Sequence, residues 1–204
     1  MSKQESNFFL VRHGKTDYNV EERVQGRLGS KLTEEGISYS KKVADVIFED
    51  TNKTNDYALY SSPFFRTKQT TEIICKKNDI IPIFDERIAE LNRGIIEGKK
   101  KSEFSHNEIF HVDAFNNNPW YYKMPEGENY TDLYERCLSF INEFHINNKN
   151  TIIVSHGFTI RMLILILTDS DRSKYNEIRA PHNLIRKLSF KHGLFIKKED
   201  LCVD

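Results

Sequence analysis

Two short segments each place a histidine directly after an apolar run. In "FFLVRHG" (8–14) the run leads into Arg12 and His13, and "TIIVSHG" (151–157) ends on His156 in the same way. A short apolar run that meets a glycine is typical of a buried strand that leaves its sheet in a tight turn. The repetition therefore predicts two histidines that are delivered to the same place.

A third segment, "SSPFFR" (61–66), adds Arg66 after another strand-like run. A pocket with two guanidinium groups, two imidazoles and the N-termini of helices suits a phosphoryl group, because arginine matches phosphate oxygens and helix starts supply amide donors. A neutral imidazole is a competent nucleophile if one ring nitrogen is held as a donor. Cations then neutralise the charge on the phosphoryl oxygens. We expect Gly14 and Gly157 to let the backbone approach the ligand closely.

Phosphoryl transfer also needs a proton donor for the leaving oxygen. The segment "RIAELNRGIIEGKK" (87–100) offers Glu90, with Glu97 as a second candidate. Burial or a neighbouring phosphate dianion keeps a carboxyl group protonated near neutral pH. A salt bridge from Glu90 to Arg87 or Arg93 is the structural alternative.

Strands and helices alternate along the chain, which predicts an α/β fold with a largely parallel sheet. In such a sheet, ligands bind outside the carboxyl ends of the strands, where the segments above would meet. Strands are predicted at 8–11, 57–62, 80–84 and 151–155, and helices at 33–48, from Ser62 and Pro63 onward, at 128–146 and at 158–168. The 80–84 strand is expected to be peripheral because Pro82 cannot donate to a ladder. The tail predicts a hairpin that turns at His192-Gly193.

Composition narrows the range of partners. Lys and Arg together number 30, as do Asp and Glu, so no net charge recruits nucleic acid or a membrane surface. The polar N-terminus leaves no room for a signal peptide, and the longest apolar run, "MLILIL" (162–167), is too short to span a bilayer. Three widely spaced cysteines favour a reducing, cytoplasmic setting.

Three other patterns in the sequence do not meet the requirements of a metal site, a phosphate-binding loop or a cysteine nucleophile. His106, His111 and Asp113 lack the His-Glu-x-x-His frame and are interpreted as a surface or packing set, so no metal or other cofactor is predicted. The glycines of 94–102 are separated by three residues instead of the four of a phosphate-binding loop. No cysteine has an arginine six positions on, so a cysteine-nucleophile phosphatase is excluded.

Six blocks in order carry a family resemblance: "VRHGKTDYN", "VQGRLGSKLTEEG", "SSPFFRTKQT", "ELNRGIIEGK", "PEGENYTDLYERC" and "VSHGFTIR". Together they resemble the histidine phosphatase superfamily over roughly residues 8–190. The resemblance implies a phosphoglycerate-mutase-like fold, a three-layer α/β/α arrangement around a mostly parallel central sheet. It further implies one domain over residues 1–204, with a small helical or loop insert at about 99–128 over the active site.

The resemblance also assigns roles to residues. It implies that His13 is phosphorylated in a covalent intermediate, that Arg12, Arg66 and His156 hold the phosphoryl group, and that Glu90 donates the proton. The residues expected to bind the substrate or line its pocket are Asn19, Gln25, Gly26, Thr16, Gly157, Arg93 and Asn183.

The sequence departs from the family pattern at Lys15, Ile96 and Asn129, where Glu, an aromatic residue and Ser are usual. Lys15 is expected to influence which substrate charge is accepted, and Ile96 to shape the floor of the pocket. The aromatic segment 104–122 is interpreted as packing of the insert, with some side chains roofing the pocket and selecting the organic half of the substrate.

These observations predict a metal-independent phosphatase that acts on a small phosphorylated metabolite. A phosphoglycerate-type mutase is the first alternative, although family mutases usually carry a longer insert between the blocks around Glu90 and His156. A phosphate-binding regulator without turnover is the second. Sugar phosphates, nucleotides, phosphoglycerates, a cobalamin-precursor phosphate and phosphoprotein all fit this chemistry, and the sequence leaves the oligomeric state open.

Overall fold

One six-stranded sheet organises the computed structural model, which describes residues 5–50, 57–143, 150–191 and 194–203. The strands run in the order β3-β2-β4-β1-β5-β6 across the sheet. Their bounds are β1 (Glu5–Arg12), β2 (Tyr57–Ser61), β3 (Pro82–Phe84), β4 (Asn150–Ser155), β5 (Leu184–Lys191) and β6 (Leu194–Cys202).

The sheet is parallel from β3 to β1 and antiparallel beyond it. β4 lies between β1 and β2 and pairs with both in parallel, while β5 and β6 form an antiparallel hairpin at the edge. This confirms the predicted mostly parallel sheet and the C-terminal strand pair; the turn predicted at His192-Gly193 lies outside the described residues. Pro82 sits on the other edge strand, β3, where its missing N–H costs no ladder bond.

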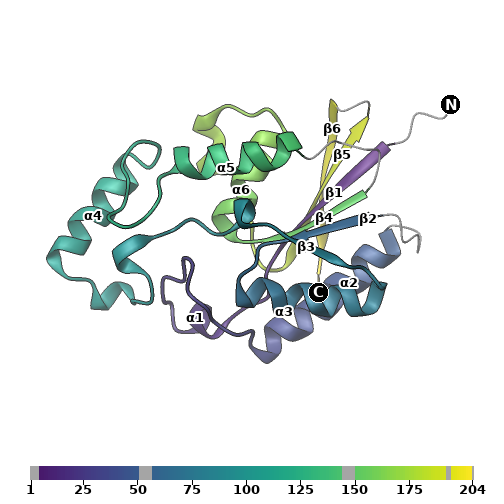
Figure 1. Cartoon of the computed structure of the whole chain (residues 1–204), viewed down its shortest axis with the longest axis horizontal. Coiled ribbons are helices and arrows are strands. Elements are labelled where there is room, and N and C mark those ends of the chain that lie inside the picture. The colour runs from purple at the N-terminus through teal and green to yellow at the C-terminus, as the bar shows by residue number, and fades with distance from the viewer. Residues whose placement is uncertain (1–4, 51–56, 144–149, 192–193, 204) are drawn as a thin grey trace.

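Helices cover both faces of the sheet, so the molecule has three layers (Figure 1). α2 (Glu34–Asp50) and α3 (Phe65–Asn78) pack on one face, and α5 (Tyr130–Glu143) and α6 (Gly157–Leu167) on the other. Successive residues of β1 alternate between the two cores: Phe8 and Leu10 join the α5–α6 side, whereas Phe9 joins the α2–α3 side. A strand buried on both faces needs a continuous apolar run, which is why 8–11 shows no polar alternation.

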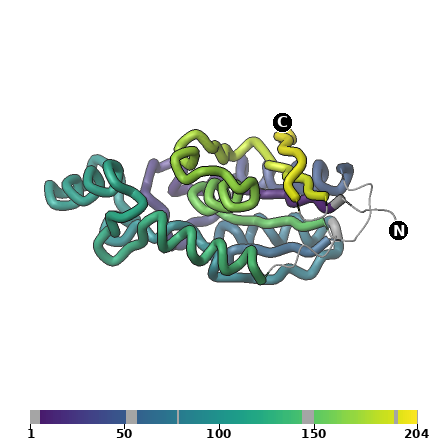
Figure 2. The backbone as a smooth tube through the Cα atoms, turned by 90° about the horizontal axis from the view of Figure 1, so that it is seen from above, coloured from purple at the N-terminus to yellow at the C-terminus, as the bar shows by residue number. Residues whose placement is uncertain are grey.

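The segment predicted as an insert lies at one end of the molecule. It contains α4 (His106–Asn117), which projects beyond the sheet on the side away from the β5–β6 hairpin (Figures 1 and 2). Ser105 caps this helix, because its hydroxyl accepts from the Glu108 N–H while the Glu108 carboxylate accepts from the Ser105 N–H.

The starts of α3 and α5 differ in their capping residues from the sequence-based expectation. α3 begins at Phe65 with no side-chain cap, two residues after the predicted start at Pro63, because the Ser62 hydroxyl is used elsewhere. Asn129 replaces the usual Ser before α5 without loss: its side-chain oxygen accepts from the Asp132 N–H at 2.9 Å, and the Asp132 carboxylate accepts from the Asn129 N–H at 3.0 Å.

The apolar run at 162–167 lies inside α6 and packs in the core shared with the sheet. Across the described ranges, no helix combines the length and the apolar character that a membrane crossing needs.

Candidate active site

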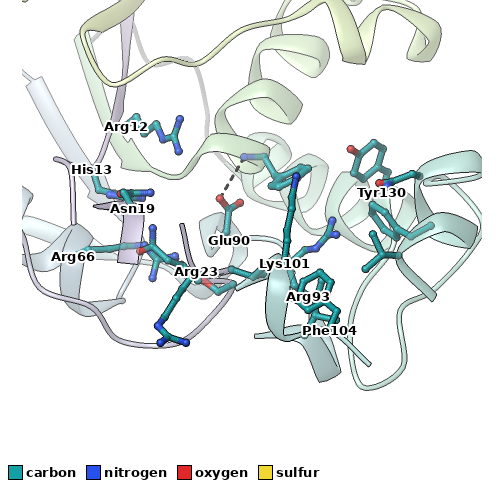
Figure 3. Close-up of a pocket in the computed structure, with 18 residues that line it drawn as sticks. Arg12, His13, Asn19, Arg23, Arg66, Glu90, Arg93, Lys101, Phe104 and Tyr130 are labelled. Carbon is teal, nitrogen blue, oxygen red and sulfur yellow. Dashed lines mark hydrogen bonds between the residues drawn. The ribbon is translucent and has the colours of Figure 1, made fainter. Parts of the chain in front are cut away.

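The carboxyl ends of β1, β4 and β2 bring the predicted phosphate-binding residues together. Arg12 at the end of β1 is in register with Ser155 at the end of β4, and Ser61 of β2 pairs with the other side of β4. The chain therefore continues from three adjacent strand ends into His13, into His156 and towards Arg66. These segments border a cavity of about 400 Å³, with Arg12, His13, Asn19 and Arg66 at one end of it (Figure 3).

His13 is buried and carries a defined hydrogen bond. Its Nδ1 lies 2.8 Å from the Gly14 carbonyl oxygen, which can only accept, so Nδ1 carries the proton and Nε2 keeps a lone pair. Burial lowers the pKa of His13 well below its usual value, and the positive charges of Arg66 and Arg12 lower it further. The imidazole is therefore neutral at pH 7, as a nucleophile requires.

His156 has the opposite tautomer. Its Nδ1 accepts from Nε of Arg66 at 3.1 Å, so its Nε2 carries the proton and donates to the Ser62 hydroxyl at 2.8 Å. Burial lowers the pKa of His156 well below its usual value, with the charge of Arg66 as the next cause. The two imidazole rings lie 5.3 Å apart between centroids, which confirms that the two histidine turns meet.

Arg66 is the most tightly held cation of the cavity. Besides His156, its guanidinium donates to the carbonyl oxygens of Leu28 at 2.8 Å and Gly26 at 2.7 Å. The side chain is 1% exposed, and burial lowers the pKa of Arg66 to about 10, so it stays charged at neutral pH. Gly26 has a φ of +48°, a left-handed conformation that aims its carbonyl at the guanidinium.

Arg12 lies against Gly157, the first residue of α6. One of its terminal nitrogens, Nη1, donates to the Ala180 carbonyl oxygen at 2.9 Å, while its Nε is buried without a hydrogen-bond partner among the described residues. Its guanidinium packs on Gly157, where an added Cβ would lie 3.3 Å from Cζ. Gly157 therefore makes room for Arg12 instead of lining the cavity itself.

Asn19 and Gln25 line the cavity, and Thr16 orients both. The Thr16 hydroxyl lies 3.0 Å from Oδ1 of Asn19 and 3.1 Å from Oε1 of Gln25. Because these contacts engage the two carbonyl oxygens, the side-chain amide groups remain as donors for a ligand. Thr16 is fully buried outside the cavity lining, so it acts through its neighbours and not as a direct contact.

Glu90 lies at the N-terminus of α6 and lines the cavity. Its carboxylate accepts from the backbone N–H of Leu91 at 3.0 Å, Thr159 at 3.3 Å and Phe158 at 3.4 Å. The last of these bonds is the dashed line at Glu90 in Figure 3. Neither Arg87 nor Arg93 forms a salt bridge with it in the described structure: Arg87 pairs with Asp85 instead. The predicted alternative, a salt bridge from Glu90 to Arg87 or Arg93, is therefore not formed, and the carboxylate is held at the start of α6 instead.

Glu97, the second candidate, has a different position. Its carboxylate accepts from the backbone N–H of Arg93 at 2.8 Å and of Arg27 at 3.1 Å, and so ties two loops together. Burial raises the pKa of Glu97, but the side chain does not line the cavity. Arg93 does line it, and its guanidinium stacks over the rings of Phe115 at 4.5 Å and Phe158 at 5.6 Å.

The end of the cavity away from His13 combines apolar side chains with the cations of Arg93 and Lys101 (Figure 3). Phe104, Val112 and Phe115 of the insert line it, together with Tyr130 and Phe158. Trp120, Tyr121 and Tyr122 are absent from the lining; Trp120 instead packs edge-on against Tyr130 and Tyr175. Part of the aromatic segment therefore reaches the cavity and Trp120 packs the insert, whereas Phe110 and Tyr121 are exposed.

Two residues expected near the substrate lie elsewhere. Asn183 is exposed, and Lys15 pairs with Glu35 at 2.7 Å; both border a separate groove beside α2. The neighbour of Asn183, His182, is the residue that sequence reasoning missed. Its Nδ1 donates to the His13 carbonyl oxygen at 2.9 Å, and burial lowers the pKa of His182 to about 3. The sequence signal for it was the histidine of the "PHN" segment, which precedes Asn183.

Gly14 has a different physical role from the one expected. An added Cβ would collide with the carbonyl oxygen of Gly36, and a Cβ on Gly36 would collide with the Lys15 backbone. Gly14 is needed because α2 begins against this turn, and not to admit a ligand.

The three residues considered as metal ligands do not form a cluster. His111 pairs with the Tyr122 hydroxyl at 2.5 Å, and His106 and Asp113 are exposed on α4. Within the described ranges, no group of three or more His, Cys, Asp and Glu side chains is placed to hold a metal ion.

Comparison with known proteins shows the family of this chain. The model of the histidine phosphatase superfamily (branch 1) matches residues 8–199. A curated relative, the probable phosphoglycerate mutase GpmB of Escherichia coli O1:K1, is 27% identical over 190 residues, which cover 92% of this chain and 86% of the relative.

Solved structures share the fold. A putative alpha-ribazole-5'-P phosphatase from Escherichia coli K-12 superposes with a TM-score of 0.85 at 16% identity, covering 98% of this chain and 96% of that one. The mycobacterial glucosyl-3-phosphoglycerate phosphatase Rv2419c superposes with a TM-score of 0.79 at 20% identity, covering 98% of both chains. These likenesses confirm the predicted α/β architecture.

Proposed function

Because this chain belongs to the histidine phosphatase superfamily, we propose that it hydrolyses small phosphomonoesters through a phosphohistidine on His13. One observation carries the proposal. The His13 ring is buried, neutral and fixed by the Gly14 carbonyl in the tautomer that leaves Nε2 free, beside the buried guanidinium of Arg66 and the half-buried Arg12.

The first half-reaction transfers the phosphoryl group to the enzyme. Nε2 of His13 attacks phosphorus, the ester P–O bond breaks, and the leaving oxygen takes a proton from Glu90. Arg12, Arg66, and the amide groups of Asn19 and Gln25, bind the phosphoryl oxygens as charge spreads over them.

The second half-reaction returns the enzyme to its starting state. Glu90, now ionised, takes a proton from water, the water oxygen attacks phosphorus, and the P–N bond breaks to release phosphate. His156 keeps its place throughout, because Arg66 and Ser62 engage both of its ring nitrogens, and it orients Arg66.

The aromatic side chains at the end of the cavity away from His13 support a substrate with an apolar or aromatic organic part. Phe104, Phe115 and Phe158 supply apolar surface there, and Arg93 and Lys101 supply positive charge. Turnover in the cytoplasm is part of the proposal, and the unpaired thiols of Cys75, Cys137 and Cys202 support a reducing setting.

Trapping the phosphoenzyme tests the proposal directly. The enzyme is mixed with a ³²P-labelled phosphomonoester, quenched in alkali within milliseconds, and digested. We expect acid-labile, alkali-stable label on the peptide that contains His13, and none in His13→Asn; His106→Asn, at an exposed histidine of α4, is the matched control. Turnover without label on His13 would refute the intermediate.

A phosphoglycerate mutase is the second candidate, because the curated relative GpmB carries that name. A mutase returns the phosphoryl group to a second hydroxyl instead of to water. Incubation with 3-phosphoglycerate, with and without 2,3-bisphosphoglycerate, separates the two. Free phosphate supports the phosphatase, and 2-phosphoglycerate formed without phosphate release supports the mutase.

A further inference from the structure

A second cavity, of about 480 Å³, adjoins the proposed catalytic cavity. The two share Arg12, Glu90 and Phe158. The rest of the lining of the second cavity comes from the first turn of α6 and from the 178–181 segment. Among the described residues that line it, none is a histidine, cysteine, serine or threonine, so this cavity is suited to binding and not to covalent transfer.

The second cavity is strongly positive. Arg12, Arg161 and Arg179 border it, against the single carboxylate of Glu90. The Glu90 oxygens already accept from backbone N–H groups at the start of α6. In the part of the chain that the structure describes, neither Arg161 nor Arg179 has a carboxylate partner. At least two positive charges are therefore left for a ligand.

Arg161 is preorganised for such a ligand. Its Nη2 donates to the Tyr175 carbonyl oxygen at 2.9 Å, and its guanidinium lies 4.2 Å from the centre of the Tyr175 ring. These contacts fix the side chain without neutralising it. Because the guanidinium is already ordered, binding an anion costs little further side-chain entropy.

Two buried guanidinium N–H groups beside this cavity lack an acceptor. Nε of Arg12 and Nε of Arg161 have no hydrogen-bond partner among the described residues. A buried donor without an acceptor costs about 1–3 kcal/mol. A nearby negative charge offsets part of that cost, because it stabilises the whole guanidinium group.

We propose that this cavity is a second anion-binding site, which takes a phosphate or carboxylate group while the catalytic cavity is occupied. Arg161 and Arg179 hold the anion, and Arg12 faces both sites. The Ala180 carbonyl oxygen accepts a hydrogen bond from Arg12, and Ala180 also lines the second cavity. An anion bound in the second cavity therefore affects Arg12 at the phosphoryl-binding end of the catalytic cavity. Binding at this site does not depend on the proposed function.

Titration with sulfate tests the site by the ¹H–¹⁵N signals of arginine Nε–H groups. Sulfate is added to the enzyme alone and to enzyme with stoichiometric orthovanadate, which fills a phosphohistidine-forming site. We expect vanadate to abolish the sulfate response of Arg66 and to leave a saturable response of Arg161. No saturable response of Arg161 overturns the second site. Failure of vanadate to bind, with the Arg161 response intact, would contradict the proposed function only.

Variants localise the anion. Arg179→Gln changes an exposed side chain and should weaken sulfate at the Arg161 signal roughly two- to fivefold, as the loss of one solvent-exposed charge contact predicts. Arg161→Gln should remove the second response altogether. Arg172→Gln is the matched control, because this exposed arginine stacks on Trp120 and Tyr134 away from the cavity and should leave the response unchanged. Equal weakening in Arg172→Gln would overturn the assignment.

Two sources can supply the anion, and kinetics separates them. If it is a second acidic group of the substrate, Arg161→Gln raises KM for phosphomonoesters with a carboxylate or second phosphate but not for those without. If it is free phosphate, the variant removes a noncompetitive component of product inhibition and leaves KM unchanged for both classes. Identical KM values and identical phosphate inhibition in the parent and Arg161→Gln would contradict both sources.

Discussion

Single hydrogen bonds decide what the two central histidines can do. The Gly14 carbonyl forces the His13 proton onto Nδ1, whereas Arg66 takes the Nδ1 lone pair of His156 and forces its proton onto Nε2. The two rings, 5.3 Å apart, thus differ: Nε2 of His13 keeps a free lone pair, whereas both ring nitrogens of His156 are engaged. The surrounding burial and positive charge keep both neutral.

The pH dependence of kcat/KM should follow the titration of His13. Burial and the charges of Arg66 and Arg12 lower the pKa of His13 well below 6.5, so the neutral nucleophile persists as the pH falls through 6.5. We expect an acid limb whose midpoint lies below 6.5, measured under subsaturating substrate. A midpoint at or above 6.5 would show that the free enzyme holds His13 in a different environment.

Replacing Arg66 by lysine tests the value of its fork geometry. Lysine keeps the charge but cannot bond at once to His156, Leu28 and Gly26. We expect Arg66→Lys to lower kcat/KM by about 10²–10³-fold, the range for loss of a preorganised charge-stabilising donor. Thermal unfolding checks that the variant remains folded. A loss below about threefold would mean that charge alone suffices.

At the level of elements, the site depends on how three strand ends and two helix starts are packed. β4 lies between β1 and β2, so the turns that follow them are adjacent. α2 closes against the first of these turns, because Gly14 and Gly36 bring two backbones into contact.

That backbone contact predicts a position-specific cost for an added methyl group. Gly36→Ala would push a Cβ into the Lys15 backbone, so we expect a loss of roughly 2 kcal/mol or more in the free energy of unfolding. Gly29→Ala is the matched control, because nothing lies within 4 Å of its added Cβ, and it should change stability by less than about 0.5 kcal/mol. Denaturant unfolding measures both; equal stabilities would refute the tight contact.

The insert element should set substrate preference. Phe104 lines the cavity, whereas Phe110 on the same insert is 64% exposed. We expect Phe104→Ala to raise KM for aryl phosphates by roughly threefold to tenfold, as the loss of a buried ring contact predicts, with a smaller effect on short-chain phosphates. Phe110→Ala should alter neither. Equal effects of Phe104→Ala on both substrate classes would argue against selection by the insert.

For the whole molecule, two buried histidines and one half-buried histidine link stability to pH. His13, His156 and His182 have pKa values lowered from 6.5, that of His182 to about 3. Above pH 6.5 neither the folded nor the unfolded state binds protons at these groups. As the pH falls below 6.5, only the unfolded state takes up protons, so the free energy of unfolding decreases.

We expect this slope to reach about 1.4 kcal/mol per pH unit for each histidine between pH 6.5 and 5, where carboxyl groups titrate little. Denaturant unfolding across that window measures it. His182→Asn should flatten the slope by about 1.4 kcal/mol per pH unit. An unchanged slope in this variant would show that His182 titrates alike in the folded and unfolded states.

The sequence by itself determined the class of fold, the sheet edge and the residues that gather there. Continuous apolar runs such as 8–11 mark strands that are buried on both faces. Parallel strands present their carboxyl ends at the same edge of the sheet, so the sequence predicts that Arg12, His13, Arg66 and His156 lie close together. These are consequences of local pattern and chain direction.

Only the tertiary structure decided which nitrogen of each histidine is free, that Glu90 and not Glu97 faces the cavity, and that His182 replaces Asn183 beside His13. It likewise placed Lys15 outside the cavity and gave Gly14 a packing role. Such facts depend on local backbone conformation, as for His13 and the Gly14 carbonyl, or on contacts of a few ångströms between residues far apart in the chain, as for His156 and Arg66. Spacing along the sequence carries no information on that scale.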